Sequence, residues 1–290
     1  MEWIREGAAF AARTPAEPDG LRALRPWVLE EADDTLRMWY SGHDGTTGRI
    51  LAAVRQPGGE WERRGVAIDA GFAGDSDRYG VESPSVVHTP GGYLMAYAGF
   101  DGEATRLHMA TSDDGVRWAA QGTIMQRGPD EALGASHPCL VGSEAGWWLF
   151  FCGYDGAHDS RHAAILAAVS PTGASWDRVG TVLEPIAGEL AVSHPSVIEV
   201  ARTFYMFYAS DDGGPGSIAV ASSADGLSWN RHGTVLAASA DWAEEGGVNS
   251  PCVVRLHDGS LRMWYAALAG GDAALAYQIS SARFVGPWSV

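Results

Sequence analysis

Ser193-His194-Pro195-Ser196-Val197 is one copy of a short proline segment that occurs five times in this chain. The five prolines stand 58, 54, 57 and 56 residues apart, so they divide the sequence into nearly equal parts. The other copies are Arg25-Pro26-Trp27-Val28, Glu82-Ser83-Pro84-Ser85-Val86, Ser136-His137-Pro138-Cys139-Leu140 and Asn249-Ser250-Pro251-Cys252-Val253. A regular period of this length indicates a repeat architecture.

Two further features follow the proline segment in each part. The first is an apolar, mostly aromatic run: Met38-Trp39-Tyr40, Met95-Ala96-Tyr97, Leu149-Phe150-Phe151, Met206-Phe207-Tyr208 and Met263-Trp264-Tyr265. The second is a tryptophan: Trp61, Trp118, Trp176, Trp229 and Trp288. Short β-rich runs separated by glycine turns predict an all-β, five-bladed β-propeller with four antiparallel strands per blade. The blades are expected near 22–67, 80–125, 134–184, 191–237 and 247–290, within a single domain of residues 1–290.

The N-terminal residues repeat a motif that the last part lacks. The motif Trp-x-Arg-x-Gly ends three of the five parts, for example at Trp61, Arg63 and Gly65. The fifth part stops two residues after Trp288, before such a motif is complete. Trp3, Arg5 and Gly7 supply the same motif near the N-terminus. Residues 1–10 are therefore predicted to form the outermost strand of the last blade, which would leave no open sheet edge in the ring.

The net charge of the chain limits the classes of partner that it is expected to bind. The 290 residues include 20 basic and 36 acidic side chains, which gives a net charge of −16. A nucleic acid would be repelled, and no basic run offsets this repulsion, so no nucleic-acid partner is expected. Every basic residue is arginine. The absence of lysine excludes a lysine Schiff base and a P-loop.

The expected location is the cytoplasm. No apolar run approaches the ~18 residues that span a membrane, so no membrane partner is expected. The start of the sequence lacks the basic and apolar regions of a signal peptide. Cys139, Cys152 and Cys252 are odd in number and have no metal-type spacing, which favours reduced core cysteines. The sequence does not predict an oligomeric state.

Candidate catalytic and binding residues lie where the innermost strands of the blades begin. Glu82, His137 and His194 are predicted as catalytic residues there, because side chains at equivalent blade positions converge on one axial funnel. The expected substrate-binding residues are Arg25 and Asn249 on the wall, and Asp44, Asp101, Asp155 and Asp211, with Asp272 beside them, in the loops around it. The alternative is that these aspartates cap their loops and that the histidines are hydrogen-bonded wall residues.

Two other interpretations concern metals and the opposite face. Glu82, His137 and His194 could together hold a divalent ion, but the favoured expectation is that they contact substrate or water, with no metal and no cofactor. The turns Ser112-Asp113-Asp114-Gly115 and Ser223-Ala224-Asp225-Gly226 lie on the opposite face in this scheme. Aspartate and glycine suit tight turns, so Asp113 and Asp225 are expected to matter for stability alone.

Pro84-Ser85-Val86, Met38-Trp39-Tyr40-Ser41-Gly42 and the Ser-x-Asp-Gly-x-x-Trp turn of residues 223–229 resemble motifs of a known superfamily. It is the five-bladed propeller glycosidase superfamily, which holds the arabinanases and xylosidases of glycoside hydrolase family 43, the invertases, the levansucrases and the mannoside phosphorylases. The resemblance covers nearly the whole chain. It implies a carbohydrate-active propeller whose catalytic carboxylates surround the axis.

The catalytic carboxylates of that superfamily are not all matched. Arg25 stands where the family has an aspartate beside the first-blade proline, and Ser83 stands near the second. Ser136 stands where the family has its acid glutamate, before the third-blade proline. Glu82 has the Glu-x-Pro spacing of that acid, but in the second blade. Glycoside hydrolysis needs two carboxylates, and here a second would have to come from a loop.

Three functions therefore remain open. The first is a glycosidase-like enzyme acting on a small sugar-derived or polyhydroxylated cytoplasmic substrate, with altered Glu/His/Arg acid–base chemistry. The second is an ordinary two-carboxylate glycoside hydrolase or phosphorylase. The third is a non-catalytic sugar-binding propeller. The fold does not choose between them, because one fold hosts many functions.

Overall fold

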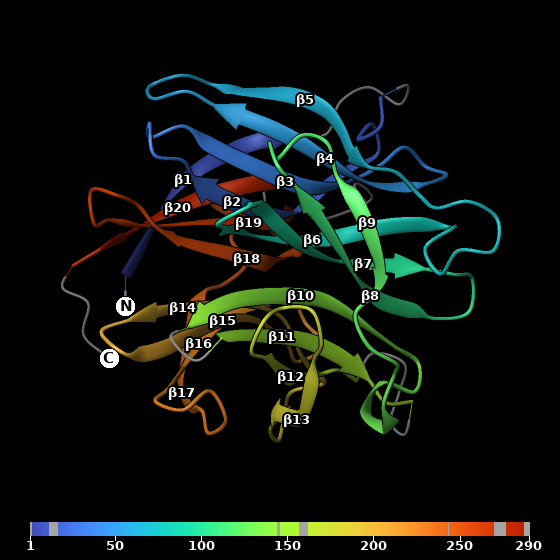
Figure 1. The fold of residues 1–290 in the computed structure, drawn as a ribbon. Helices are drawn as coiled ribbons and strands as arrows, with labels where there is room; N and C mark the ends of the chain where they lie inside the picture. Colours follow the sequence, from blue (N-terminus) through green and yellow to red (C-terminus); the bar gives the residue numbers. More distant parts are fainter. Residues whose placement is uncertain are drawn as a thin grey trace.

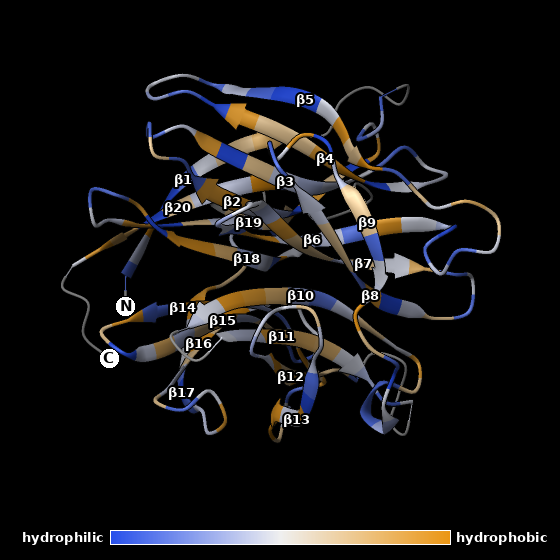
Figure 2. Ribbon diagram, viewed as in Figure 1, coloured by the Kyte–Doolittle hydropathy of each residue, from blue (hydrophilic) through white to orange (hydrophobic). Residues whose placement is uncertain are grey.

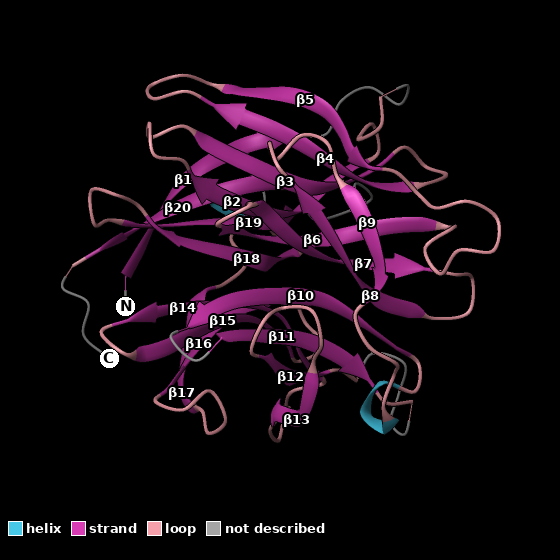
Figure 3. Cartoon of the chain, in the orientation of Figure 1, coloured by secondary structure: helices cyan, strands magenta, loops and turns pink. Residues whose placement is uncertain are grey.

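The computed structural model describes residues 2–11, 17–143, 146–156, 162–242, 244–269 and 277–286, so Asp272 and Trp288 lie outside the described residues. The described chain is built almost entirely of β-strands, as expected (Figure 3). Its helical elements are two short 3₁₀ turns, η1 (Pro129–Glu131) and η2 (Ala240–Trp242). Over the residues that the structure describes, no helix has the length and apolarity needed to cross a membrane.

Antiparallel hydrogen bonding joins the strands in groups of four, and parallel bridges link the first three groups into one 12-stranded sheet (Figure 1). The first and second groups are β2 (Arg22–Glu30), β3 (Leu36–His43), β4 (Gly48–Arg55) and β5 (Trp61–Ile68), then β6 (Gly80–Thr89), β7 (Gly92–Phe100), β8 (Thr105–Ser112) and β9 (Ala119–Thr123). The third and fourth are β10 (Gly134–Ser143), β11 (Gly146–Tyr154), β12 (Ala164–Ser170) and β13 (Asp177–Leu183), then β14 (Ala191–Val200), β15 (Thr203–Asp211), β16 (Ser217–Ser223) and β17 (Asn230–Leu236). The fifth is β18 (Gly247–Arg255), β19 (Leu261–Leu268), β20 (Tyr277–Val285) and β1 (Glu2–Ala11).

The N-terminal strand β1 belongs to the same sheet as the last strands of the chain. It pairs antiparallel with β20, from Glu2 opposite Val285 to Ala11 opposite Gln278, as the sequence predicted. Trp3 and Phe10 on β1 are buried in two different hydrophobic clusters. The two ends of the described chain therefore stabilise one sheet, although they are far apart in the sequence.

Neighbouring groups are linked by single parallel bridges, each from the start of the third strand of one group to the inner strand of the next. Parallel bridges join Gly48 to Gly80, Thr105 to Gly134, Ala163 to Ala191 and Gly216 to Gly247. The residue after the recurring proline also contacts the inner strand of the next group. Four backbone amides donate to such a side chain: Leu140 to Ser85 (2.9 Å), Val197 to Cys139 (3.2 Å), Val253 to Ser196 (3.0 Å) and Val28 to Cys252 (3.2 Å). The last of these bonds joins the fifth group to the first.

The three cysteines are core residues, as the sequence indicated. Cys139, Cys152 and Cys252 are free and buried, and burial raises the pKa of each thiol to about 12. Their sulfur atoms accept backbone N–H groups, including that of His194 on Cys152 at 3.1 Å. They are therefore protonated, unreactive packing residues at neutral pH.

Inner and outer strands differ in hydropathy. Inner strands such as β10 and β18 are largely apolar, whereas the outer strand β5 is mostly hydrophilic (Figure 2). The buried apolar side chains form clusters that each draw on more than one group, as in the cluster of Trp39 on β3 with Val86 on β6 and Met95 on β7. Packing between groups therefore holds the sheets together.

A repeated ion pair explains the arginine of the Trp-x-Arg-x-Gly motif. In four groups this arginine pairs with a carboxylate in the loop before the inner strand: Arg63 with Asp19, Arg178 with Glu131, Arg231 with Glu189 and Arg5 with Glu244. A tyrosine of the second strand also donates to the carboxylate in several groups, as Tyr265 does to Glu244 at 2.8 Å. In the second group Ala120 replaces the arginine, and Asp77 accepts from Tyr97 at 3.1 Å. These carboxylates, all buried except the partly buried Glu189, are held by fixed partners and act as structural anchors.

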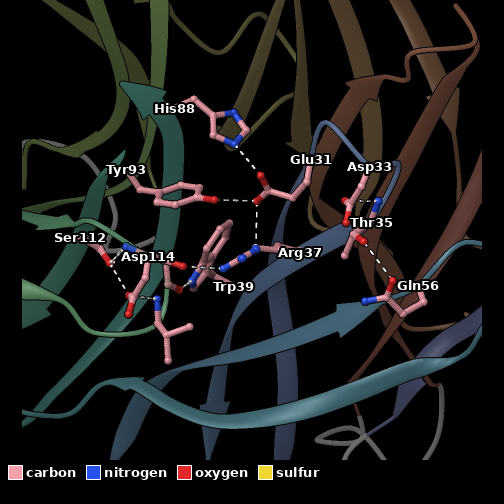
Figure 4. Close-up of polar contacts among 12 residues, drawn as sticks. Glu31, Asp33, Thr35, Arg37, Trp39, Gln56, His88, Tyr93, Ser112 and Asp114 are labelled. Carbon is pink, nitrogen blue, oxygen red and sulfur yellow. Dashed lines mark hydrogen bonds and ion pairs between the residues drawn. The ribbon is translucent and has the colours of Figure 1, made fainter. Parts of the chain in front are cut away.

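The turns between the third and fourth strands have the expected structural role. Asp114 accepts the N–H groups of Val116 and Arg117 at 2.8 and 2.9 Å, and Asp225 accepts those of Leu227 and Ser228 at the same distances. These bonds lower the pKa of both carboxyl groups. The second-group turn is held by Asp114 and not by Asp113, because only the residue before the glycine faces those amides. Figure 4 shows this turn bound through Asp114 and Arg37 to the neighbouring Glu31 network.

Candidate active site

The residue before each recurring proline has an unusual backbone conformation. These residues are Arg25, Ser83, His137, His194 and Ser250, with φ angles of 55°, 56°, 51°, 54° and 51°. A left-handed conformation is rare for residues other than glycine, and a following proline restricts the backbone further. Each lies at a break in the pairing register between the first two strands of its group. The same strained bulge thus occurs five times, which marks a functional or structural constraint.

These residues line a common recess. Of the residues predicted at the inner-strand starts, Arg25, His137 and His194 line it, whereas Glu82 and Asn249 do not. The recess is formed by the left-handed residues, their prolines and Trp27. Its volume is about 30 Å³, enough for roughly one water molecule. A sugar ring would therefore have to lie above the recess. Ser83 Oγ and His137 Nε2 are buried without a hydrogen-bond partner among the described residues, so both are available to a small bound group.

His137 and His194 lie against each other in the recess. Their ring centroids are 3.6 Å apart with an interplanar angle of 50°. Each Nδ1 atom is hydrogen-bonded to the preceding serine, Ser136 at 2.5 Å and Ser193 at 2.7 Å. Burial lowers the pKa of His137 well below its usual value, with smaller effects from His194 and Arg25, and burial with Arg25 lowers that of His194 to about 3. The lowered pKa values favour neutral imidazoles at pH 7, and thus a role other than that of a cationic acid.

Arg25 and Glu82 form an ion pair at the edge of the recess. Arg25 belongs to the first group and Glu82 to the second, so the pair bridges the two inner strands β2 and β6. The Glu82 side chain is 40% exposed, and that of Arg25 is 22% exposed. A second small recess beside them is lined in part by His43 and Ser41. Glu82 is therefore a carboxylate that a substrate can reach. It lies at the strand mouths, the parts of the inner strands around the proline segments.

The predicted loop aspartates are engaged in their own loops. Asp44 accepts from the amides of Thr46 and Thr47 at 2.8 and 2.9 Å, and it pairs with Arg49. Asp101 accepts from Glu103 and Ala104 at 2.8 Å and pairs with Arg106. These contacts lower the pKa of both carboxyl groups. Asp155 lies 3.8 Å from His162 Nδ1, and Asp211 accepts from the Gly213 amide at 2.7 Å.

These contacts match the loop-capping alternative for Asp44 and Asp101. Neither these four aspartates nor Asn249 lines the recess. Asn249 Oδ1 instead accepts a hydrogen bond from Ser250 at 2.9 Å. Substrate contact by any of them would have to occur above the strand mouths.

The ligating atoms of Glu82, His137 and His194, the alternative metal set considered from the sequence, are not gathered within 4.8 Å of one another. Over the described part of the chain, the group of three metal-ligating atoms that comes together within 4.8 Å is Glu30, Asp34 and His257, at turns far from the proline segments. Glu82, His137 and His194 are not such a group. In particular, Glu82 is directed to Arg25, while the two histidines are held by their serines.

Solved structures with a similar fold include glycoside hydrolases and a phosphorylase. A structure of BT0996 in an RGII complex aligns with a TM-score of 0.79 and 17% identity over 98% of this chain and 93% of that protein. A thermostable family-43 glycoside hydrolase gives 0.78 and 14% over 92% and 91%. The β-1,2-mannobiose phosphorylase from Listeria innocua gives 0.78 and 12% over 98% and 97%. The chain has the fold of the β-propeller glycoside hydrolases.

This likeness confirms the resemblance to the propeller glycosidase superfamily at the level of fold. At these identities it carries no activity across to the chain. A scan against protein-family models gives no match, and a search of curated protein sequences gives none either.

Three residues at the site were not among the predicted catalytic or substrate-binding residues. Ser83 and Ser250 occupy the same left-handed position as the histidines, and the shared proline was the available signal. The Tyr154 hydroxyl lies 3.2 Å from Ser136 Oγ, and burial raises its pKa. Tyr154 stands next to the predicted Asp155. The sequence repeat therefore predicts its position near the site, but it does not predict the direction of its side chain.

The neutral histidines give a testable pH dependence. An unfolded histidine has a pKa near 6.5, above that of folded His194. Between these values the unfolded chain binds protons that the folded chain does not, so stability falls as the pH decreases through this window. In NMR titrations from pH 8 to 5, we expect the His137 and His194 ring signals to stay constant.

His257 is the matched control for this titration. It is exposed, and its hydrogen bond to Asp34 raises its pKa, so its signal should shift with a midpoint above 6.5. Substitution of each histidine by glutamine assigns the signals. A midpoint near 6.5 for His137 or His194 would show that the recess is wet and that the imidazoles can act as acids.

Proposed function

We propose that this chain is a glycosidase-like enzyme with its site above the recess at the inner-strand mouths. The observation that carries the proposal is that five equivalent strained residues surround one recess with Glu82 and Arg25 at its edge. Strain of this kind is commonly stored at functional sites. The fold shared with glycoside hydrolases and a phosphorylase supports carbohydrate as the substrate class.

The site belongs, in this proposal, to one closed five-bladed propeller made of residues 1–290. The four-stranded groups are its blades, and β1 completes the last one. Two contacts support closure between the last and first groups. Val28 N–H donates to Cys252 Sγ, and the Trp61 ring packs edge-on against Trp264 at 6.3 Å. A closed ring fixes the inner strands around one axis and thereby preorganises the side chains at their mouths.

Glu82 is the proposed acid or base, and Arg25 its positioning partner. A substrate hydroxyl or glycosidic oxygen near Glu82 would exchange a proton with the carboxylate, while the guanidinium supports developing negative charge. His137 and His194 act as neutral groups that bind substrate or water, since burial keeps them uncharged. This modifies the Glu–His acid–base pair expected from the sequence, because neither imidazole carries a proton to donate as a cation.

A small polyhydroxylated substrate suits this site better than an anionic one. The chain carries a net charge of −16, and a negatively charged polymer would meet repulsion over most of its surface. A phosphorylase is favoured as the second candidate, since Arg25 could bind inorganic phosphate as a planar donor. The proposed substrate lies in the cytoplasm, as expected from the sequence.

A turnover screen tests this proposal. Aryl glycosides of arabinose, xylose, mannose, glucose and galactose are incubated with the protein, with and without inorganic phosphate, and the released phenol is measured. We expect turnover of at least one glycoside. Phosphate-dependent turnover would select the phosphorylase. Saturable sugar binding in calorimetry without any turnover would contradict catalysis and favour a sugar-binding propeller.

A further inference from the structure

The contacts between neighbouring groups repeat one aromatic pair, and this repeat fails at one junction. In four junctions the motif tryptophan of one group packs edge-on against the second-strand aromatic residue of the preceding group. The pairs are Trp118 with Trp39 (5.9 Å, 87°), Trp229 with Phe150 (5.8 Å, 85°), Trp3 with Phe207 (5.7 Å, 88°) and Trp61 with Trp264 (6.3 Å, 84°).

The exception is the junction between the second and third groups. The equivalent tryptophan is Trp176, and the second-strand position that it would meet is Ala96. Met109 lies opposite Ala96 on β8, where the other groups have the smaller Ala52, Ala167, Val220 or Ser281. Ala96 thus stands in place of an aromatic ring, with the flexible Met109 side chain opposite it, and no aromatic pair joins the described residues of this junction.

A groove of about 590 Å³ opens at this junction. Trp147 and Trp176 line it together with Leu94, Met109, Thr111 and Gln121. The Trp176 indole is fixed by its hydrogen bond to the Gly173 carbonyl at 3.2 Å. A Cβ atom on Gly173 would lie 3.7 Å from the Trp147 ring, so the same turn touches both indoles. The turn therefore holds the Trp176 indole, and the Trp147 ring lies beside the same turn.

The groove is also lined by polar side chains, but by no charged ones. The Gln121 amide donates to Thr111 Oγ1 and to the Ala119 carbonyl, both at 3.2 Å, which holds it on β8 and β9. Further threonines lie along the groove, and none of its lining residues is charged, although the chain has a net charge of −16. Fixed indole rings, hydroxyls and one amide without charges match the apolar C–H face and hydroxyl edges of a neutral sugar.

We propose that this groove binds a neutral oligosaccharide, separately from the recess at the strand mouths. The groove includes Thr172, Gly173 and Ala174, from a turn between the third and fourth strands, whereas the recess is built from the proline segments. Antiparallel strands place these two features at opposite ends of the groups. The inference concerns binding alone and does not require catalysis in the recess.

Calorimetry of the full chain with neutral hexaoses from arabinan, xylan and mannan tests this proposal. At least one should bind with a Kd in the millimolar range or tighter, and oligogalacturonate of the same length should bind at least tenfold more weakly. Trp147→Ala should weaken binding at least tenfold, because it removes one stacking surface. Ala174→Arg should also weaken it, since Ala174 is exposed at the rim and the new side chain enters the groove.

Two control variants distinguish binding in this groove from binding elsewhere on the chain. Trp242→Ala removes an exposed tryptophan far from the groove in sequence and should leave affinity unchanged. Glu82→Gln should also leave it unchanged, because Glu82 lies at the recess. Circular dichroism melts confirm that Trp147→Ala and Ala174→Arg remain folded, and two independent groove variants guard against a folding defect in one. No binding to any neutral hexaose, preference for oligogalacturonate, or loss of binding in Glu82→Gln alone would overturn the proposal.

Discussion

A variant lacking residues 1–11 is expected to lose most of its stability and to aggregate at concentrations where the full chain stays monodisperse. Deletion removes the partner strand of β20 and the buried rings of Trp3 and Phe10. Loss of a buried aromatic side chain costs about 3–5 kcal/mol each, against about 5–15 kcal/mol for a whole domain. Glu244, fully buried, would also lose its ion pair with Arg5.

Urea unfolding and light scattering measure this effect. A synthetic peptide of residues 1–11, added to the truncated protein, should restore part of the stability, because it can pair with β20 as a separate strand. A truncated protein that melts like the full chain would contradict the role of β1 in closing the last group. A single substitution, Arg5→Ala, should give a smaller loss, about 3–5 kcal/mol, from the unpaired Glu244.

The second large effect is expected for Glu82→Gln, which should lower kcat/KM by about 10²- to 10⁴-fold on the glycoside found in the turnover screen. Glutamine keeps the shape of the side chain but cannot exchange a proton. Because the Glu82 side chain is 40% exposed, we expect a stability change of less than about 1 kcal/mol. Steady-state kinetics and urea unfolding on the same preparation separate the two effects.

Asp114→Asn is the matched control for this prediction, since it neutralises a carboxylate on the turn face. It should lower stability through the lost N–H bonds to Val116 and Arg117 and leave kcat/KM unchanged in the folded fraction. If His137→Ala and His194→Ala leave turnover unchanged while Glu82→Gln and one loop aspartate variant abolish it, an ordinary two-carboxylate glycosidase is the better account. Full activity in Glu82→Gln would remove Glu82 from the mechanism.

The repeat made the strand order predictable from the sequence. Proline segments, aromatic runs and tryptophans recur at one period, and each marks a strand or turn that the backbone must form in the same way every time. The convergence of His137 and His194 with Ser83 and Arg25 followed from that period, because equivalent positions of a repeat meet in space. The pairing of β1 with β20 followed from the motif at Trp3, Arg5 and Gly7.

Side-chain partners were less predictable, since they depend on contacts between groups that no local pattern specifies. The Arg25–Glu82 ion pair joins residues of two parts of the chain, and the contact of the histidine rings depends on left-handed backbone angles at both positions. The carboxylates paired with the motif arginines recur at a regular spacing, but their residue type varies: the first is an aspartate, Asp19, and the others are glutamates. That variation hid them among the other acidic residues of the loops.

The most direct test of the proposed site is a crystal structure of the Glu82→Gln variant with the screened substrate bound. The account predicts a sugar above the recess, with one of its oxygen atoms within hydrogen-bond distance of residue 82 and another contacting Arg25 or His137 Nε2. A sugar found only at the junction groove or against the turns that contain Asp114 and Asp225, with the strand mouths holding solvent alone, would contradict it.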